Sequence, residues 1–279
     1  MSDQDKESSK ALEIINWAVT VPGVKVNRES FLIETLKVSP EQKGILLEKG
    51  PIASGLFTAK EIKKIAKSLA SKRKWQSTGT SFIAGLPGGF ATAVTIPTDT
   101  LQFFGFSLRL AQEIAYLYDT PDFWRGELLD DNRVKTELML YLGTMLGVSG
   151  AASAMRLVTQ AFGKQLAKDL SKQALTKTVW YPMLKTLGKY VGIKITKDTI
   201  SRGASKVIPL LGGIFSGSLT FYTMDKMNER LIKAFDIGII YTESEKIADE
   251  ETLKQEMPEV YEAMFEEIQE DDPESKTSF

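Results

Sequence analysis

The chain has 279 residues, of which 43% are hydrophobic, and its 35 lysines and arginines nearly balance 36 aspartates and glutamates. It contains no histidine and no cysteine, which excludes disulfides, Cys/His zinc sites and catalysis by Ser-His-Asp or Cys-His arrangements. The net charge of −1 gives no overall basic field for nucleic acid, and no nucleic-acid-binding motif is present, so we expect no such partner.

The first 57 residues predict short helices. The opening MSDQDKESSK is polar and lacks the apolar centre of a secretory signal, so we expect a solvated N-terminus. Apolar residues recur at helical spacing over 11–19 and 30–36. The run Ser39-Pro40-Glu41-Gln42 is typical of a capped helix start with proline at the first helical position.

A basic amphipathic helix is predicted from residue 58 onward. Thr58 and Glu61 have the spacing of a capping box. Apolar residues then share one face, and lysines lie on the other. Segment 60–74 carries seven positive charges and one negative. We expect either a solvated face or a surface for anionic lipid. The candidate lipid-facing residues are Lys60, Lys63, Lys64, Lys67, Lys72, Arg73 and Lys74.

Three uncharged stretches, 75–98, 138–155 and 207–224, are at least 18 residues long, which is long enough to suggest membrane spans. Their many small residues, the two prolines of the first stretch and Asp99 directly after it favour glycine-packed helical hairpins instead. Glycines four residues apart lie on one helix face and let a neighbouring helix approach closely. The pairs are Gly85/Gly89, Gly143/Gly147 and Gly213/Gly217.

The remaining patterns complete an all-α prediction, in which glycine-rich hairpins pack into one helical core with peripheral amphipathic helices. The only strand candidate is the weak pattern IGIIYT at 237–242. We divide the chain into N-terminal short helices (1–57), a core (58–240) and an acidic C-terminal helix and tail (241–279). The further helices are expected at about 80–94, 98–118, 134–160, 161–176, 179–190, 207–235 and 252–269.

Segment 85–119 is the richest in motifs and resembles the EcsC family of bacterial proteins. Its matching residues are Gly85, Leu86, Pro87, Gly88, Gly89, Ile96, Pro97, Thr98, Asp99, Gln102, Gln112 and the run 115–118; Ile208, Pro209, Gly212 and Gly213 resemble the family's second hairpin. The likeness covers roughly residues 70–240. Two positions depart from the family pattern: Ser107 replaces a histidine common among members, and Asp119 replaces a glycine. The resemblance implies a bacterial protein named for its neighbour in an ABC-transporter operon, with membrane proximity and no established activity.

Nine residues are candidates for a ligand site or a structural motif: Gly85, Pro87, Gly88, Gly89, Pro97, Asp99, Gln102, Gln112 and Asp225. The glycines favour a tight turn over a phosphate loop, because no Gly-Lys-Ser/Thr follows them and no strand precedes them. Asp99 is interpreted as a helix cap, a buried polar anchor or a catalytic carboxylate, and Asp225 has the same alternatives. No metal site and no cofactor are predicted.

Three functions are compatible with these patterns. We favour a non-enzymatic accessory protein on the cytoplasmic face of the membrane, binding anionic lipid or a membrane partner, with an integral protein of three crossings as the alternative topology. The second is a binder of a lipid-like ligand in an apolar pocket. Its walls would include Phe90, Phe103, Phe104 and Phe106. The third is an enzyme that pairs Asp99 with Asp225 or Glu113.

Overall fold

The computed structural model describes residues 23–77, 98–124, 131–165, 217–258 and 260–262. Every regular element in these ranges is helical, which confirms the all-α prediction. The elements are α2 (Arg28–Leu36), the 3₁₀ turn η1 (Pro40–Gln42), α3 (Lys43–Lys49), α4 (Ala59–Ser77), α5 (Thr98–Leu117), α6 (Asp131–Leu146), α7 (Ala151–Gln165), α10 (Gly217–Ile239) and α11 (Glu243–Glu256).

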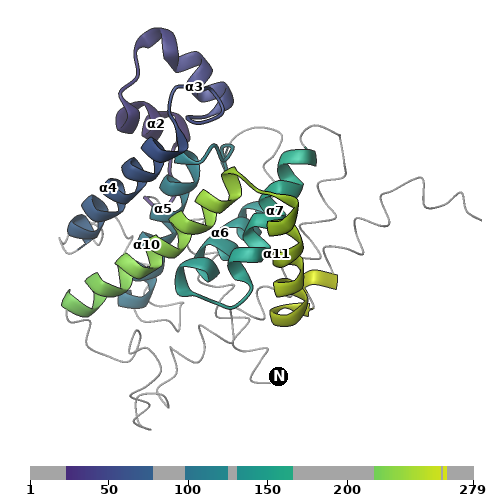
Figure 1. Cartoon of the computed structure of the whole chain (residues 1–279). Helices are drawn as coiled ribbons and strands as arrows, with labels where there is room; N and C mark the ends of the chain where they lie inside the picture. The colour runs from purple at the N-terminus through teal and green to yellow at the C-terminus, as the bar shows by residue number, and fades with distance from the viewer. Residues whose placement is uncertain (1–22, 78–97, 125–130, 166–216, 259, 263–279) are drawn as a thin grey trace, which may run out of the picture.

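Helix α5 lies between α4 and α6, and α10 crosses the bundle to contact α4, α5, α6 and α7 (Figure 1). Helix α11 packs on α7, while α2 and α3 form a small cap at the end where α5 finishes. Helices α4 and α11 therefore lie at opposite edges of the bundle. Residues from all three predicted segments of the chain enter one hydrophobic core, from Val24 to Val260.

Polar caps fix several helix starts. The predicted capping box is confirmed, since Thr58 Oγ1 accepts from Glu61 N and Glu61 Oε2 accepts from Thr58 N. Ser39 and Gln42 form a second box at η1, with Pro40 at its first position. A third box, Thr242 with Glu245, starts α11 about ten residues earlier than the predicted 252.

The prediction of one continuous helix over 134–160 is wrong. The chain turns between α6 and α7 at Gly147 and Gly150, whose φ values of +75° and +79° favour glycine. A Cβ on Gly147 would lie 2.9 Å from Cζ of Arg230, whose Nη1 donates to Met145 O (3.1 Å). Gly147 therefore ends α6 beneath an arginine from α10 and does not lie inside a helix as the pairing with Gly143 predicted.

The weak strand pattern at 237–242 does not form a strand, because α10 continues to Ile239. Its β-branched residues lie at the end of a long helix, where packing against α6 and α7 outweighs strand propensity. Tyr241 follows the helix and donates its hydroxyl to Asp249 Oδ2 (2.8 Å), so this segment joins α10 to α11.

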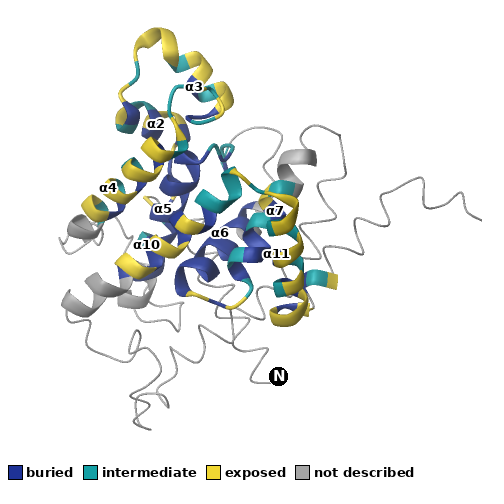
Figure 2. Ribbon diagram, viewed as in Figure 1, coloured by how far each residue is buried: buried dark blue, intermediate teal, exposed yellow. Residues whose placement is uncertain are grey.

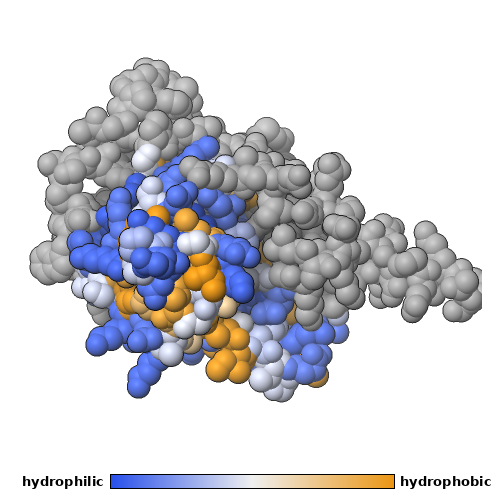
Figure 3. All heavy atoms as spheres, turned by 90° about the horizontal axis from the view of Figure 1, so that it is seen from above, coloured by the Kyte–Doolittle hydropathy of each residue, from blue (hydrophilic) through white to orange (hydrophobic). Residues whose placement is uncertain are grey.

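Burial follows the helical period in α4 (Figure 2). Ile62 and Ala66 are fully buried on α4, with lysines on its outer side, as predicted. Almost every described side chain of α5 is buried. A helix apolar all round belongs at the centre of a bundle. The large exposed apolar side chains among the described residues are Ile45, Ile240 and Ile247, and Figure 3 shows apolar surface lying among hydrophilic side chains.

Several predicted features lie outside the described residues. They are the helices 11–19, 80–94 and 179–190, the glycine-rich segments 85–89 and 207–216, and the end of the predicted helix 161–176. Across the portion of the chain that the structure does describe, no helix combines the length and the apolar character that crossing a bilayer requires.

Candidate functional site: a cavity and a lysine face

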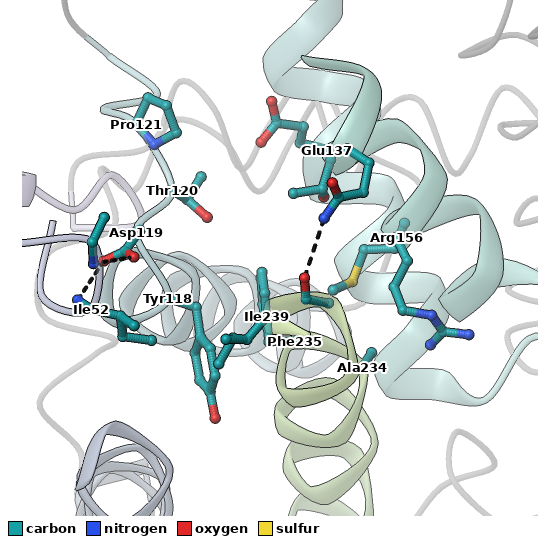
Figure 4. Close-up of a pocket in the computed structure, with 15 residues that line it drawn as sticks. Ile52, Tyr118, Asp119, Thr120, Pro121, Glu137, Arg156, Ala234, Phe235 and Ile239 are labelled. Carbon is teal, nitrogen blue, oxygen red and sulfur yellow. Dashed lines mark hydrogen bonds between the residues drawn. The ribbon is translucent and has the colours of Figure 1, made fainter. Parts of the chain in front are cut away.

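A cavity of about 470 Å³ opens where the end of α5 meets α6, α7, α10 and the turn after α3 (Figure 4). This volume lies within the range of small-molecule sites, roughly 300–1,000 Å³. The lining residues come from five segments that are distant in sequence: Ile52, Ala53, Tyr118, Asp119, Thr120, Pro121, Glu137, Met155, Arg156, Thr159, Gln160, Ala234, Phe235, Gly238 and Ile239.

One wall is built by Asp119. Its φ of +64° lies in the left-handed region, which favours glycine over residues with a side chain. Its carboxylate accepts from the backbone N–H groups of Ile52 (2.8 Å) and Ala53 (2.9 Å). Gly50 leaves the necessary room, since a Cβ there would lie 2.9 Å from Cγ of Asp119. Burial raises the pKa of the Asp119 carboxyl, although the two backbone N–H groups oppose this shift.

Arg28 stabilises the same wall of the cavity through two hydrogen bonds to backbone carbonyl groups. The buried guanidinium donates through Nε to Thr120 O (3.0 Å) and through Nη1 to Leu47 O (2.8 Å). Burial lowers the pKa of Arg28, while Asp122 and Asp119 act in the opposite direction. The arginine therefore connects α2, α3 and the chain after α5, which keeps the loop that carries Asp119 and Thr120 in place.

Tyr118 and Phe235 form the floor, with their rings stacked 5.2 Å apart and 17° from parallel. The Tyr118 hydroxyl points out of the cavity (Figure 4) and donates to Asp236 Oδ1 (2.8 Å). Burial, followed by the neighbouring Asp236, raises the pKa of Tyr118 well above its usual value. Asp236 also pairs with Lys63 of α4. The floor of the cavity is thereby connected to the outer face of α4.

Glu137 lies across the cavity from Asp119, and its carboxylate points into the space (Figure 4). The residue is only 5% exposed, and Tyr141 donates its hydroxyl to Oε2 of Glu137 (3.1 Å). Beside it, Gln160 Nε2 donates to the carbonyl of Gly238 (3.2 Å). The polar atoms at this end of the cavity are therefore mainly hydrogen-bond acceptors.

Arg156 lines the cavity, but its guanidinium is directed toward α11. It forms a bidentate pair with Asp249, whose Oδ2 also accepts from Tyr241. Burial acts to raise the pKa of Asp249, but the bonds from Arg156, Ser153 and Tyr241 outweigh it and hold the pKa below the ordinary value. The positive charge of Arg156 is thus already neutralised by a neighbouring helix.

Gly238 leaves part of the cavity empty. It lies three residues after Phe235 and four after Ala234, so helical spacing places it on the face of α10 that lines the cavity. A Cβ added at Gly238 would meet no atom within 4 Å. Any larger side chain at this position would enter open space.

The second candidate surface is the outer face of α4, which we call the lysine face and define as Lys60, Lys64 and Lys67. All three side chains are exposed, and within the described residues no hydrogen bond or ion pair engages them. Lys233 of α10, which packs beside α4, is likewise exposed. Lys63 is exposed but pairs with Asp236. Lys72 is also exposed, and the Lys74 side chain lies outside the described residues.

Arg73 does not belong to the lysine face, although the sequence analysis placed it there. It points inward and binds Glu113 in a bidentate pair, with Nε–Oε2 at 2.8 Å and Nη2–Oε1 at 2.7 Å. Arg109 adds a contact to Glu113 Oε1 at 3.3 Å. The Glu113 side chain is fully buried between these two cations, so it is not available as the second carboxylate of a catalytic pair.

Gln112 is a structural residue. Its amide oxygen, Oε1, accepts from Val26 N and Trp124 Nε1. Its amide nitrogen, Nε2, donates to Val24 O and Leu108 O. All four hydrogen-bonding positions are used, which leaves none for a ligand. Ser107 is buried and donates its hydroxyl to Phe103 O (2.8 Å).

Asp225, the other predicted site residue whose side chain the structure describes, does not line the cavity. Asp225 is exposed on α10, and α5 begins at Thr98 as expected, with the side chains of Asp99 and Gln102 outside the description. The candidates Gly85, Pro87, Gly88, Gly89 and Pro97 also lie outside the described residues.

Of the predicted aromatic walls, the three that the structure describes do not line this cavity, and Phe90 lies outside the described residues. Phe103 and Phe104 are buried in the core, where their rings pack edge to face at 5.4 Å, and Phe106 is partly buried against the same core. Of the aromatic residues, only Tyr118 and Phe235 line the described cavity.

Among the residues described, no cluster of three or more Asp or Glu side chains is arranged to hold a metal ion. Comparison of the chain with protein-family models, curated proteins and solved structures finds no match. The resemblance to the EcsC family is therefore a prediction from the quoted motifs alone.

Proposed function

We propose that this protein is a non-enzymatic, helical accessory protein that docks on anionic membrane surfaces through the lysine face of α4. The carrying observation is that Lys60, Lys64 and Lys67 project together from a helix whose opposite side is anchored in the core. A lysine near an anionic bilayer contributes about 1 kcal/mol to binding.

Two features of the structure support a docking role over a merely solvated face. The helix is held rigidly, because Arg73 and Glu113 join it to α5, and Lys63 and Asp236 join it to α10. The acidic α11 lies at the opposite edge of the bundle, away from the lysine face. This separation of charge orients the molecule toward a negative surface.

The resemblance to the EcsC family, which implies membrane proximity, agrees with this proposal. The same placement predicts a location on the cytoplasmic face of the membrane, where anionic lipids concentrate.

Flotation of the full-length protein with liposomes tests the proposal. We expect binding to vesicles that contain anionic lipid, little binding to neutral vesicles, and loss of binding as salt screens the charges. Replacing Lys60, Lys64 and Lys67 together by glutamine should lower the partition coefficient on the order of 100-fold, which corresponds to about 1 kcal/mol for each lysine.

The matched control replaces Lys37, Lys49 and Lys254 by glutamine, which removes the same charge from exposed positions outside α4. Equal loss of binding in both triple variants would show that only net charge matters. No binding of the wild-type chain to anionic vesicles would reject the proposal.

A further inference from the structure

The side-chain hydroxyl of Thr120 faces the cavity without a hydrogen-bond partner among the described residues. The residue is only 6% exposed. Figure 4 shows its side chain projecting into the cavity from the loop that follows α5. Buried hydroxyl groups are normally hydrogen-bonded, because an unpaired one costs free energy. The position of this hydroxyl therefore indicates a partner that enters the cavity from outside.

The loop after α5 holds the Thr120 hydroxyl in a fixed place. Thr120 N donates to Ala115 O (3.1 Å), and Thr120 O accepts from Nε of Arg28 (3.0 Å). Pro121 follows directly and disfavours a helical backbone at Thr120, while branching at Cβ limits the rotation of the side chain. Because the group is already ordered, a ligand that bonds to it does not have to order it on binding.

Most of the remaining lining is apolar. Ile52, Pro121, Met155, Phe235 and Ile239 come from four different segments and enclose the same space. Such a surface favours a hydrocarbon body, because apolar area is removed from water on binding.

The charged side chains of the described lining are engaged within the protein. Asp119 accepts from two backbone N–H groups of the neighbouring turn. Glu137 accepts from the hydroxyl of Tyr141, and the guanidinium of Arg156 binds Asp249. A charged head group would give up its hydration on entering, which costs far more free energy than burying a neutral polar group. The lining is therefore better suited to an uncharged ligand.

We propose that this cavity binds a small neutral amphiphile, a hydroxyl or carbonyl group on a hydrocarbon body, with the polar group hydrogen-bonded to Oγ1 of Thr120. A threonine hydroxyl can donate to a carbonyl and can either donate to or accept from an alcohol. The open space at Gly238 adds room for the hydrocarbon. The proposal narrows the lipid-like ligand of the sequence analysis to an uncharged one, and it does not depend on the lysine face.

Isothermal titration of the full-length protein with octanol, octanoate and octylamine tests the class of ligand, since the three probes share one hydrocarbon chain. We expect octanol to bind at least about tenfold more tightly than either charged probe, because only the charged heads lose a strong hydration shell. Equal or tighter binding of octanoate or octylamine, or no binding of octanol, would overturn the proposal.

Thr120→Val tests the hydrogen bond, because valine keeps the shape of the side chain and removes the hydroxyl. We expect octanol to bind about fivefold more weakly, as the net contribution of one hydrogen bond implies. The matched control, Thr120→Ser, keeps a hydroxyl and should bind octanol more tightly than Thr120→Val does. Unchanged octanol affinity in Thr120→Val would overturn the proposal.

The stability of the ligand-free variant distinguishes a ligand contact from a structural role. Since the Thr120 hydroxyl has no partner among the described residues, Thr120→Val should unfold at the same urea concentration as wild type or at a higher one. A lower midpoint would show that the hydroxyl stabilises the fold instead, which would overturn the proposal.

Gly238→Leu is the blocking variant, because its side chain would occupy the empty space on the cavity face of α10. The matched control is Gly44→Leu on the exposed surface of α3, where a Cβ also meets no atom within 4 Å. We expect Gly238→Leu to abolish octanol binding and Gly44→Leu to retain it, with both variants folded by circular dichroism. Octanol binding that survives Gly238→Leu would place the ligand elsewhere and overturn the proposal.

A measurement on the wild-type chain keeps the test independent of any variant's folding. Methyl NMR signals of Ile52, Met155 and Ile239 should shift on addition of octanol, while those of Ile45 and Ile247, exposed at other sites, should not. Shifts confined to the exposed isoleucines would overturn the proposal. Since no vesicle is present, this result is independent of membrane docking.

Discussion

A single left-handed residue, Asp119, fixes the mouth of the cavity. Its backbone adopts a conformation that costs an ordinary residue about 1–2 kcal/mol, and its carboxylate offsets this cost through two backbone N–H groups of the neighbouring turn. Gly50 makes the approach possible because it has no side chain. Residues 50 and 119 therefore depend on each other although they are far apart in sequence.

Three substitutions of Asp119 separate backbone conformation from hydrogen bonding. Asp119→Asn should be the mildest, because asparagine tolerates positive φ and retains an acceptor. Asp119→Gly keeps the conformation but loses the tether, and should lower the free energy of unfolding by about 2 kcal/mol. Asp119→Ala should cost roughly 1 kcal/mol more.

Urea unfolding measures these differences, provided that the slope of the transition is unchanged. If Asp119→Ala and Asp119→Gly had the same free energy of unfolding, the left-handed backbone conformation at residue 119 would be contradicted. Full stability of the glycine variant would contradict the role of the carboxylate.

At the scale of the helices, buried ion pairs join elements whose contact the sequence did not predict. Arg73 and Glu113 join α4 to α5, and Arg156 and Asp249 join α7 to α11. Breaking such a pair on one side leaves a buried charge, which typically costs about 3–5 kcal/mol. These pairs therefore set the position of the two outer helices against the core.

Removing Arg73 should destabilise the protein without weakening its binding to lipid. Among the described residues, Arg73→Gln leaves Glu113 with Arg109 as its cationic partner, so we expect the free energy of unfolding to fall by about 2–3 kcal/mol. At a temperature where the variant is folded, its partition onto anionic vesicles should match that of wild type. A selective loss of vesicle binding would show that Arg73 contributes to lipid binding together with the lysine face.

Asp249 should make the free energy of unfolding depend on pH in the acidic range. Its pKa in the folded protein lies below the ordinary 3.8, so its contribution to stability is present above pH 3.8. The contribution is lost as the pH falls from 3.8 through the lowered pKa. The stability difference between wild type and Asp249→Asn should be constant from about pH 5 to 7 and shrink below 3.8. A difference independent of pH down to 2.5 would contradict this.

At the scale of the whole molecule, the helical period predicted α2, α4 and α5 well, since each has apolar residues that recur on one face. The same period also identifies Arg73 as an inward residue. It follows Ala66 by seven positions and Ile62 by eleven, and at about 100° per residue all three share one face. Counting the charges of segment 60–74 did not reveal the inward position of Arg73, because such a count takes no account of where each side chain points.

The α6–α7 turn and the cavity were harder to predict. The run Gly147-Val-Ser-Gly150 fits a turn as well as a packing groove, and only the approach of Arg230 distinguishes them. The cavity combines residues from five separated segments, so no local motif marks it. Among the lining residues, the motif at 85–119 had drawn attention to two: Tyr118, within the run 115–118, and Asp119, which departs from the pattern of the family that the motif resembles.

The open space beside Gly238 gives a simple criterion for comparing related chains. One hydrogen atom stands where any other amino acid would place carbon, so the volume of the cavity depends on this position. Homologues with alanine or glycine here should retain the vacancy, whereas those with leucine, isoleucine or phenylalanine should have it filled. Variation at this one position would thus change the size of the cavity while the surrounding scaffold stayed the same.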